Sequence, residues 1–259
     1  MDKPERPVFL GDSLIPRWEA PAGVQAVCGT RGGGVSVPPW DRMNLGDHVG
    51  DDPAAVAANR QAFANSLGAR PVFLRQVHGT RVAVLDAKSP DGLEADACVT
   101  RARRVACTIM VADCLPVLLA DLRGGVVAAA HAGWRGLAGE GGRGVLESVM
   151  AHLDPAHSVA WLGPCIGPSA FEVGPEVREA FEAGDPGSGA CFHAAAHGKW
   201  LADLPALARR RLQALGVDAA HIGGNDGSPA WCTVTQQSRF FSHRRDRVSG
   251  RFAASVWLA

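Results

Sequence analysis

The chain has 259 residues, with 26 basic and 26 acidic side chains and therefore no net formal charge. This length suffices for one large domain or two small ones, and the balanced charge gives no global basis for binding nucleic acid or an anionic membrane. No apolar run reaches the ~18 residues of a transmembrane helix, and residues 1–18 lack the apolar core of a signal peptide. We therefore expect no nucleic acid and no membrane among its partners.

The cysteine pattern bears on the cellular compartment. The seven cysteines are odd in number and include no CxxC pair. In a chain without an export signal this pattern favours reduced thiols, and hence a cytoplasmic protein. The sequence has no internal repeat and no long linker. We expect a single domain over residues 1–259, with residues 1–20 as an extended N-terminal segment, and we favour a monomer.

The predicted elements follow a clear order along the chain. The first helix covers residues 53–67, because Asp52 can cap it, Pro53 suits its first position and Gly68 can end it. Apolar patterns then predict strands at 72–77, 81–85, 95–100, 105–111, 117–120, 126–130, 159–162 and 252–258. Further helices are predicted at 143–153, 175–183 and 204–215. Because several strands precede the later helices, the pattern favours an α+β fold: a mixed β-sheet sandwich flanked by helices.

Three of these predicted strands end beside a side chain that can bind a metal. His78 follows the strand that begins at Pro71, Cys114 follows the strand from Val105, and His131 follows the strand from Gly125. Residues at the ends of neighbouring strands can converge on one point. Zinc held by three protein ligands keeps a fourth position for water or substrate, as in catalytic sites. The sequence therefore predicts a catalytic zinc site of His78, Cys114 and His131.

Other patterns suggest weaker sites. His193 and His197 would share one face of a helix at four-residue spacing, although the alanines between them supply no HExxH acid. Residues 139–144 match GxGxxG, but they begin too far from the preceding strand for a dinucleotide site. The helix start that follows could still hold a phosphate-like anion with Arg135 or Arg143. Residues 239–251 carry five arginines and one acid, which fits either a solvated face or an anion site.

A family resemblance rests on long motifs that occur in a fixed order. They are Arg31-Gly-Gly-Gly-Val-Ser36, Asn44-Leu-Gly46, His48-Val-Gly-Asp-Asp52, Asn59-Arg60, Arg75-Gln-Val-His-Gly79, Ala112-Asp-Cys-Leu-Pro116, His131-Ala-Gly-Trp-Arg-Gly136, Gly163-Pro-Cys-Ile-Gly167 and Phe240-Phe-Ser-His-Arg-Arg-Asp246. From about Gly29 to its end, the chain resembles the laccase-domain family, long labelled multicopper polyphenol oxidases. Where members usually carry a Tyr in the last motif, this chain has Phe241 and His243, and it contains no Tyr.

The resemblance implies a mixed α/β sandwich related to a toxin-type deamidase, and the same metal ligands, His78, Cys114 and His131. It also implies a zinc-dependent purine nucleoside enzyme: phosphorolysis of adenosine, inosine and methylthioadenosine, and deamination of adenosine. Some bacterial members are instead called peptidoglycan editing factors. The oxidase label fits poorly, because none of the nine histidines are two residues apart as HxH pairs require. Zinc is therefore preferred to copper, whose blue centres also want a long axial Met.

Four further residues complete the expected site. Arg60 and Arg135 are candidates for holding phosphate, and Gln76 and Asn44 for contacting the nucleoside.

Two alternative functions remain open. One is a metal-free cysteine hydrolase acting on a cell-wall precursor, with Cys114 as the nucleophile and His131 or His78 as the base. The other is a non-enzymatic binding protein that the metal merely stabilises.

Overall fold

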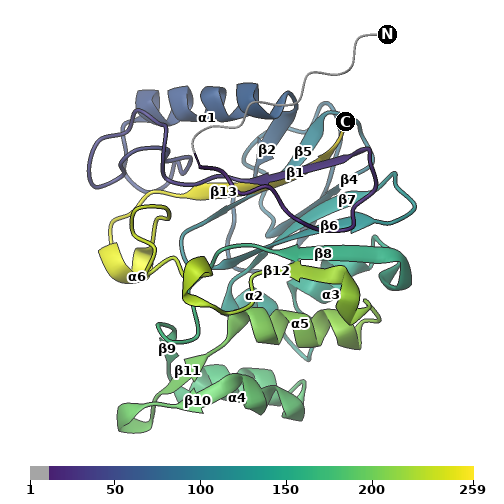
Figure 1. Cartoon of the computed structure of the whole chain (residues 1–259), viewed down its shortest axis with the longest axis vertical. Helices are drawn as coiled ribbons and strands as arrows, with labels where there is room; N and C mark the ends of the chain where they lie inside the picture. Colours follow the sequence, from purple (N-terminus) through teal and green to yellow (C-terminus); the bar gives the residue numbers. More distant parts are fainter. Residues whose placement is uncertain (1–11) are drawn as a thin grey trace.

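The computed structural model describes residues 12–259, in which two mixed β-sheets pack face to face (Figure 1). The four-stranded sheet has the order β1 (Val24–Cys28), β13 (Phe252–Leu258), β5 (Val105–Val111) and β2 (Arg70–Phe73). The six-stranded sheet has the order β12 (Ile222–Gly224), β8 (Ser158–Leu162), β6 (Leu115–Asp121), β7 (Val127–Ala132), β4 (Ala97–Thr100) and β3 (Val82–Leu85). The predicted mixed sandwich is confirmed.

Helices cover the outer face of each sheet (Figure 1). Helix α1 (Pro53–Leu67) lies on the four-stranded sheet, while the six-stranded sheet carries α2 (Trp134–Ala138), α3 (Val145–Met150) and α5 (Leu204–Ala214). A small sheet lies with α4 (Pro175–Glu182) at one end of the long axis; its strand order is β10 (Phe192–Ala194), β11 (Trp200–Ala202) and β9 (Glu172–Val173). Helix α6 (His243–Asp246) precedes β13, and 3₁₀ turns occupy Pro155–His157, Pro186–Cys191, Ala196–Gly198, Ala219–His221 and Pro229–Trp231.

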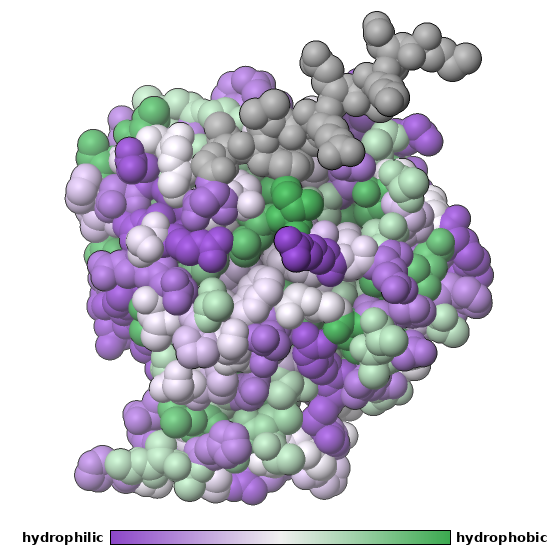
Figure 2. Space-filling view, in the orientation of Figure 1, coloured by the Kyte–Doolittle hydropathy of each residue, from purple (hydrophilic) through white to green (hydrophobic). Residues whose placement is uncertain are grey.

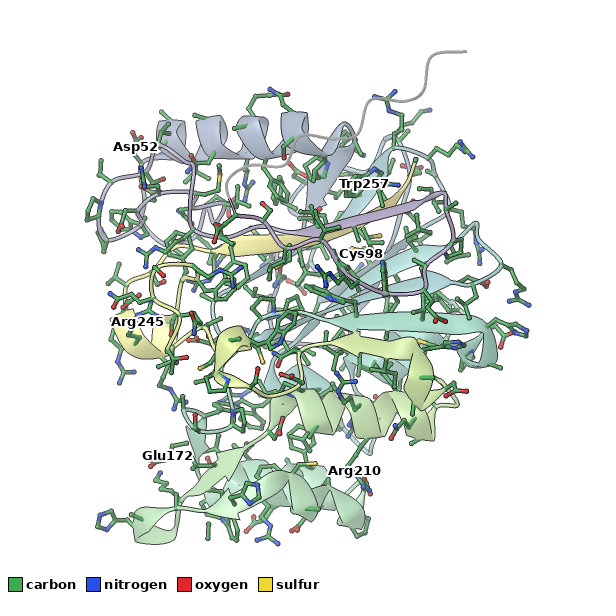
Figure 3. All side chains as sticks on the ribbon, viewed as in Figure 1. Asp52, Cys98, Glu172, Arg210, Arg245 and Trp257 are labelled. Carbon is green, nitrogen blue, oxygen red and sulfur yellow. The ribbon has the colours of Figure 1, made fainter. Side chains whose placement is uncertain are left out.

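Three apolar layers hold these elements together. Phe63 packs between α1 and the four-stranded sheet together with Trp257, which is labelled in Figure 3. Leu118 of β6 packs between the two sheets. Its neighbour Leu119 faces the opposite way, toward α3 and α5. Since both faces of β6 are buried, its sequence is an unbroken apolar run rather than an alternating one.

Most predicted elements occur close to their expected bounds. The strands at 105–111 and 252–258 and the helix at 53–67 have the predicted limits, and Asp52 accepts a hydrogen bond from the Ala54 amide at 3.0 Å. The strand expected at 72–77 is instead β2, which ends at Phe73. Beyond Phe73 the chain leaves the sheet, because the amides of residues 77–79 bond to the Asp96 carboxylate. The helix expected at 143–153 spans only Val145–Met150.

The N-terminal prediction can be followed only in part. Residues 1–11 of the expected extended segment lie outside the described residues, and Leu14 pairs with Cys28 at the end of β1. The sequence patterns missed β1 and the short strands β9 to β12. Across residues 12–259, no helix combines the length and apolar character needed to span a bilayer.

Candidate functional site

The predicted metal ligands lie at one end of the β6–β7 pair. These strands are antiparallel, so the start of β6 lies beside the end of β7, with Pro116 opposite His131. Cys114 directly precedes β6, and His131 is the next-to-last residue of β7. His131 is thus within its strand rather than after it, and Cys114 lies three residues past Val111, where β5 ends. His78, Cys114 and His131 thus converge as the sequence predicts, although the strands do not end where the sequence pattern places their limits.

Asp96 brings the third ligand, His78, to this point. Its carboxylate is fully buried just before β4 and accepts hydrogen bonds from the amides of Val77 (3.1 Å), His78 (2.8 Å) and Gly79 (2.7 Å). These bonds hold the loop after β2, in which His78 has a left-handed backbone with φ of 63°. Such a conformation is costly for a residue with a side chain, so the three bonds fix a position that the loop would otherwise avoid.

Asp96 also orients His131. The Nδ1 atom of His131 lies 2.9 Å from Asp96 Oδ1, and the imidazole is 4% exposed. A histidine ligand commonly donates its second ring N–H to a carboxylate, which fixes the tautomer and the ring plane. Here that bond leaves Nε2 of His131 for a metal. Burial raises the pKa of Asp96, but the hydrogen bonds from His131 and the loop amides lower it by a larger amount. The net shift of the pKa is therefore downward.

The donor set fits a zinc ion. The ligand atoms of His78, Cys114 and His131 all lie within 4.8 Å of one another, and Cys114 Sγ is 3.7 Å from His78 Nε2. Zinc–ligand lengths of ~2.3 Å to sulfur and ~2.0–2.1 Å to nitrogen would separate two tetrahedral donors by roughly 3.5 Å. Gly133 leaves the room they need, because a Cβ there would lie 2.9 Å from both Cys114 Sγ and His78 Cδ2.

The ligands also interact electrostatically in the metal-free chain. Burial raises the pKa of Cys114, but the charge of His131 and hydrogen bonds to both imidazoles outweigh this and lower the pKa to about 6. Burial lowers the pKa of His131, but the Cys114 thiolate and Asp96 raise it to about 9. A thiolate is the form of cysteine that binds metals. Cys114 is therefore already in its metal-binding form, whereas the protonated His131 must release a proton before its Nε2 can bind a metal.

A cavity of about 430 Å³ opens beside the three ligands. This volume is within the ~300–1,000 Å³ usual for small-molecule sites. Its apolar lining includes Trp134, Ile166, Phe171 and Leu204, while several arginines and one acid, Asp113, supply charge. The cavity can therefore take a flat apolar group together with an anionic one.

The four additional predicted residues divide into two pairs. Gln76 and Arg135 line the cavity: Gln76 is held by two hydrogen bonds to the Met110 backbone, and Arg135 stacks on Trp134 at 4.4 Å. Asn44 and Arg60 are not among its lining residues. Asn44 is fully buried, and Arg60 donates to the Leu45 carbonyl and pairs with an aspartate. This placement favours a structural role for the second pair.

The competing sites of the sequence analysis do not form. His193 is in strand β10 and His197 in a 3₁₀ turn with φ of 54°, so the predicted helix that would align them is absent from the described structure. At the glycine-rich stretch, the Gly144 amide donates to the Glu147 carboxylate at 2.6 Å. That helix start is thus capped by its own side chain, and neither residues 139–144 nor Arg143 line the cavity.

The basic segment at residues 239–251, by contrast, reaches the site. His243, Arg244, Arg247 and Arg251 all line the cavity. Arg245, labelled in Figure 3, points instead to the Thr233 and Val234 carbonyls and pairs with Asp246. The position of this segment beside the three candidate ligands supports its interpretation as an anion-binding segment.

Sequence reasoning missed two aspartates that organise the site. Asp96 stands between two alanines just before the buried strand β4. An acidic residue in such a small, apolar setting is the one signal that could have marked it. Asp113 directly precedes Cys114, has φ of 96°, and accepts hydrogen bonds from Thr233 Oγ1 and the Arg244 amide, both at 2.6 Å. It therefore ties the Cys114 loop to α6. Neither partner could be foreseen from sequence spacing.

A protein family described as "Multi-copper polyphenol oxidoreductase laccase" matches residues 25–259. The chain belongs to this family. Purine nucleoside phosphorylase PA4543 of Pseudomonas aeruginosa is 50% identical over 95% of this chain and 98% of its own length. Purine nucleoside phosphorylase YfiH of Escherichia coli is 47% identical, with 95% and 98% covered. The recognised resemblance is thus confirmed.

Solved structures support the same assignment. Protein NMB0706 of Neisseria meningitidis superposes with a TM-score of 0.88 at 44% identity, covering 96% of this chain and 99% of that one. YlmD of Geobacillus stearothermophilus gives a TM-score of 0.82 at 32% identity, with 92% of each chain covered. The mixed α/β architecture therefore continues over nearly the whole length of these proteins.

Proposed function

We propose that this chain is a zinc-dependent purine nucleoside phosphorylase that also deaminates adenosine. The single observation that carries the proposal is the clustering of His78, Cys114 and His131 on a cavity of nucleoside size. Relatives that cover almost the whole chain are named purine nucleoside phosphorylases. The expected substrates are adenosine, inosine and methylthioadenosine.

The proposed reactions set clear demands on the cavity. In phosphorolysis, a phosphate oxygen forms a bond to C1′ of the ribose while the bond from C1′ to the purine breaks, which yields ribose 1-phosphate and the free base. The protein must therefore hold an anion against the sugar while the base lies on an apolar surface. Trp134 and Phe171 offer such a surface, and the arginines of the cavity can hold the anion. Deamination replaces the adenine amino group by a water oxygen and needs no phosphate.

His78, Cys114 and His131 would hold the metal. When bound there, zinc would supply Lewis acidity that lowers the pKa of water or polarises a substrate atom. A structural zinc site normally has four protein ligands, and in the described residues only three donor side chains cluster here. The open position argues against a binding protein that the metal merely stabilises. A single cluster also argues against a four-copper oxidase.

The substrate test separates the proposed activity from its competitors. Purified protein should release hypoxanthine from inosine only when inorganic phosphate is present, with ribose 1-phosphate as the second product. Cys114→Ala should abolish this activity, whereas Cys191→Ala should retain it, because Cys191 does not line the cavity. Base release at the same rate without phosphate would identify a nucleoside hydrolase instead. No turnover of any purine nucleoside would refute the proposal and favour the cell-wall precursor.

The proposal also includes the setting of the enzyme. All seven cysteines are free in the structure, which is consistent with the expected cytoplasmic location, since reduced thiols are the rule there. We further propose that the enzyme acts as a monomer on small molecules alone. Light scattering of the purified chain at micromolar concentration would check the oligomeric state.

A further inference from the structure

The cavity carries more positive charge than a neutral nucleoside needs. Four guanidinium groups line it: Arg135, Arg244, Arg247 and Arg251. The one acid among the lining residues is Asp113, and both of its oxygens already accept hydrogen bonds from protein groups. A metal ion would add further positive charge. Such an excess favours an anionic ligand.

Arg251 stands out among these four by its environment. Its Nη1 donates to the carbonyls of Ser249 (2.8 Å) and Gly250 (3.0 Å), and it forms no ion pair with a carboxylate in the described residues. Burial lowers the pKa of Arg251, and the charges of Cys114 and Asp113 raise it only in part. A largely buried charge normally has a partner. Within the described residues, the hydrogen-bond partners of the Arg251 guanidinium are two neutral carbonyls, and both accept from the same nitrogen, Nη1.

The two remaining nitrogens of Arg251 have the geometry of an anion fork. Nε and Nη2 share one edge of the planar guanidinium, and neither has a hydrogen-bond partner within residues 12–259. That edge is the one that binds two oxygens of a phosphate or carboxylate in parallel. Arg251 lines the cavity, and because its Nη1 is bonded to the two carbonyls, the plane of the guanidinium is fixed without further ordering.

Surrounding residues hold Arg251 firmly in place. Asn44 Oδ1 accepts a hydrogen bond from the Arg251 amide at 2.8 Å, and the Leu45 amide donates to the Arg251 carbonyl at 2.9 Å. Gly46 lies so close that a Cβ there would be 2.8 Å from Arg251 Cγ. The buried Asn44, which we expected to touch the substrate, therefore acts by positioning Arg251.

Two neighbours can complete a subsite. His48 lines the same cavity. Its side chain is 58% exposed, yet partial desolvation and then the charge of Arg251 lower its pKa, so the imidazole is neutral and can donate one N–H. Arg247 is exposed, and its guanidinium has no hydrogen bond or ion pair in the described structure. Figure 2 shows hydrophilic side chains gathered over α6 and the adjoining loops, where this segment reaches the surface. An anion bound here would thus contact the fixed guanidinium edge of Arg251 and two side-chain donors that can adjust, His48 and Arg247.

We propose that Arg251, with His48 and Arg247, forms a subsite for the phosphate group of the substrate. This assignment rests on the proposed function and moves the phosphate away from Arg135. Arg135 is stacked on Trp134, so its guanidinium, unlike that of Arg247, is already held against a side chain of the cavity. The phosphate group has two possible sources, free inorganic phosphate or the phosphate of a nucleotide, and the chemistry of recognition is the same for both.

The test measures phosphate binding without turnover. Inorganic phosphate is titrated into the purified enzyme in the absence of nucleoside, at low salt, by calorimetry or ³¹P NMR. Arg251→Gln should weaken binding roughly ten- to hundredfold, as expected for the loss of two charge-assisted hydrogen bonds. Arg251→Lys keeps the charge but not the fork and should fall between. The matched control is Arg239→Gln, since Arg239 belongs to the same basic segment but pairs with Asp12 and does not line the cavity.

Two further variants keep the test decisive if Arg251→Gln is unstable. Arg247→Gln removes an exposed side chain and should weaken phosphate binding by about threefold, as one exposed charge contributes little. Arg135→Gln should leave it nearly unchanged. Loss of binding in Arg135→Gln, with Arg247→Gln and Arg251→Lys unaffected, would overturn the assignment.

A nucleotide arm identifies the source of the phosphate group. Adenosine 5′-monophosphate is titrated into the same set of proteins. Binding of the nucleotide that depends on Arg251, without binding of inorganic phosphate, would support the subsite and make the substrate a nucleotide. Phosphate binding at Arg251 in a protein that turns over no nucleoside would support the subsite and refute the proposed function. The two proposals can therefore fail separately.

Discussion

The two charged groups of the cavity are built in different ways. The metal group, His78, Cys114 and His131, is fixed by the ends of paired strands and by one buried carboxylate, Asp96. The arginine cluster, Arg244, Arg247 and Arg251, comes from a single segment that includes short helix α6 and ends just before strand β13. Arg247 in that segment has a left-handed backbone and a free guanidinium in the described structure. The metal group is therefore rigid, while the arginine cluster combines fixed side chains with one, Arg247, that can adjust.

This difference suits the two tasks. Three ligands of one ion must keep fixed separations, since zinc–ligand distances vary by only about 0.2 Å. A phosphate that enters and leaves with each turnover needs one fixed contact and some donors that can follow it. Arg251 provides the fixed contact, because Asn44 and two carbonyls hold it. Variants of the metal group should therefore affect stability more than variants of the arginine cluster.

The largest effect is expected at Asp96. One of its oxygens accepts from His131 and the His78 amide, and the other accepts from the amides of Val77 and Gly79. Asp96→Asn would direct an NH₂ group at one of these donor pairs. We expect a loss of about 3–5 kcal/mol in unfolding free energy and a roughly 10–100-fold loss of metal affinity. Denaturant unfolding and zinc titration would measure both.

The control for this variant is Asp121→Asn. Asp121 also lies at a strand end, but its carboxylate bonds only to the backbone and side chain of Arg123. Asp121 is itself buried, but its partner Arg123 is exposed, and ion pairs at the surface contribute about 0–1 kcal/mol, so the change should be small. An equal loss in both variants would show that Asp96 is no more than an ordinary buried carboxylate.

An intermediate effect is expected from Gly133→Ala. The new methyl group would lie 2.9 Å from Cys114 Sγ and from His78 Cδ2, and one of these ligands must move. Overpacking of this kind costs about 1–3 kcal/mol, and metal affinity should fall with it. Gly23→Ala is the matched control, because a Cβ at Gly23 has nothing within 4 Å. Unchanged metal affinity in Gly133→Ala would mean that the ligands are less constrained than the structure indicates.

An effect on stability no larger than that of Gly133→Ala is expected at Asp113, which links the two groups. Asp113→Ala removes the acceptor of the Thr233 hydroxyl and of the Arg244 amide. It should lower the unfolding free energy by about 1–3 kcal/mol. Asp113→Asn can keep both bonds, with its oxygen toward the amide and its NH₂ toward the hydroxyl, and should restore most of the loss. If Asp113→Asn were as unstable as Asp113→Ala, the charge of Asp113 would matter more than its hydrogen bonds. Thermal unfolding of the two variants side by side would decide.

Much of the fold was predictable because apolar periodicity is a local property. Strands β5 and β13 are long and buried on both faces, and helix α1 has a cap, a first-position proline and a terminal glycine. The short strands β9 to β12 were missed, since two or three residues carry too little pattern. The proposed metal ligands are marked in the sequence by turn signals that follow apolar runs, even though His131 lies inside its strand.

The rest of the site depends on contacts between distant segments. Asn44 and Arg251 are 207 positions apart in the chain, and Asp113 and Arg244 are 131 apart. No local pattern marks such pairs. For this reason the sequence marks Asn44 and Arg60 as substrate contacts, although neither lines the cavity. Arg251 was recognised only as one member of a basic segment.

The most direct test of the central claim is a zinc titration of the metal-free enzyme with inosine and phosphate as substrates. Metal would be removed with a chelator, and zinc returned in measured amounts while hypoxanthine release is followed. The account predicts no activity without metal and a linear rise that saturates at about one zinc per chain, with Cys114→Ala inactive at every zinc level. Full activity in the metal-free protein would contradict the account and would favour a hydrolase that uses the Cys114 thiolate directly.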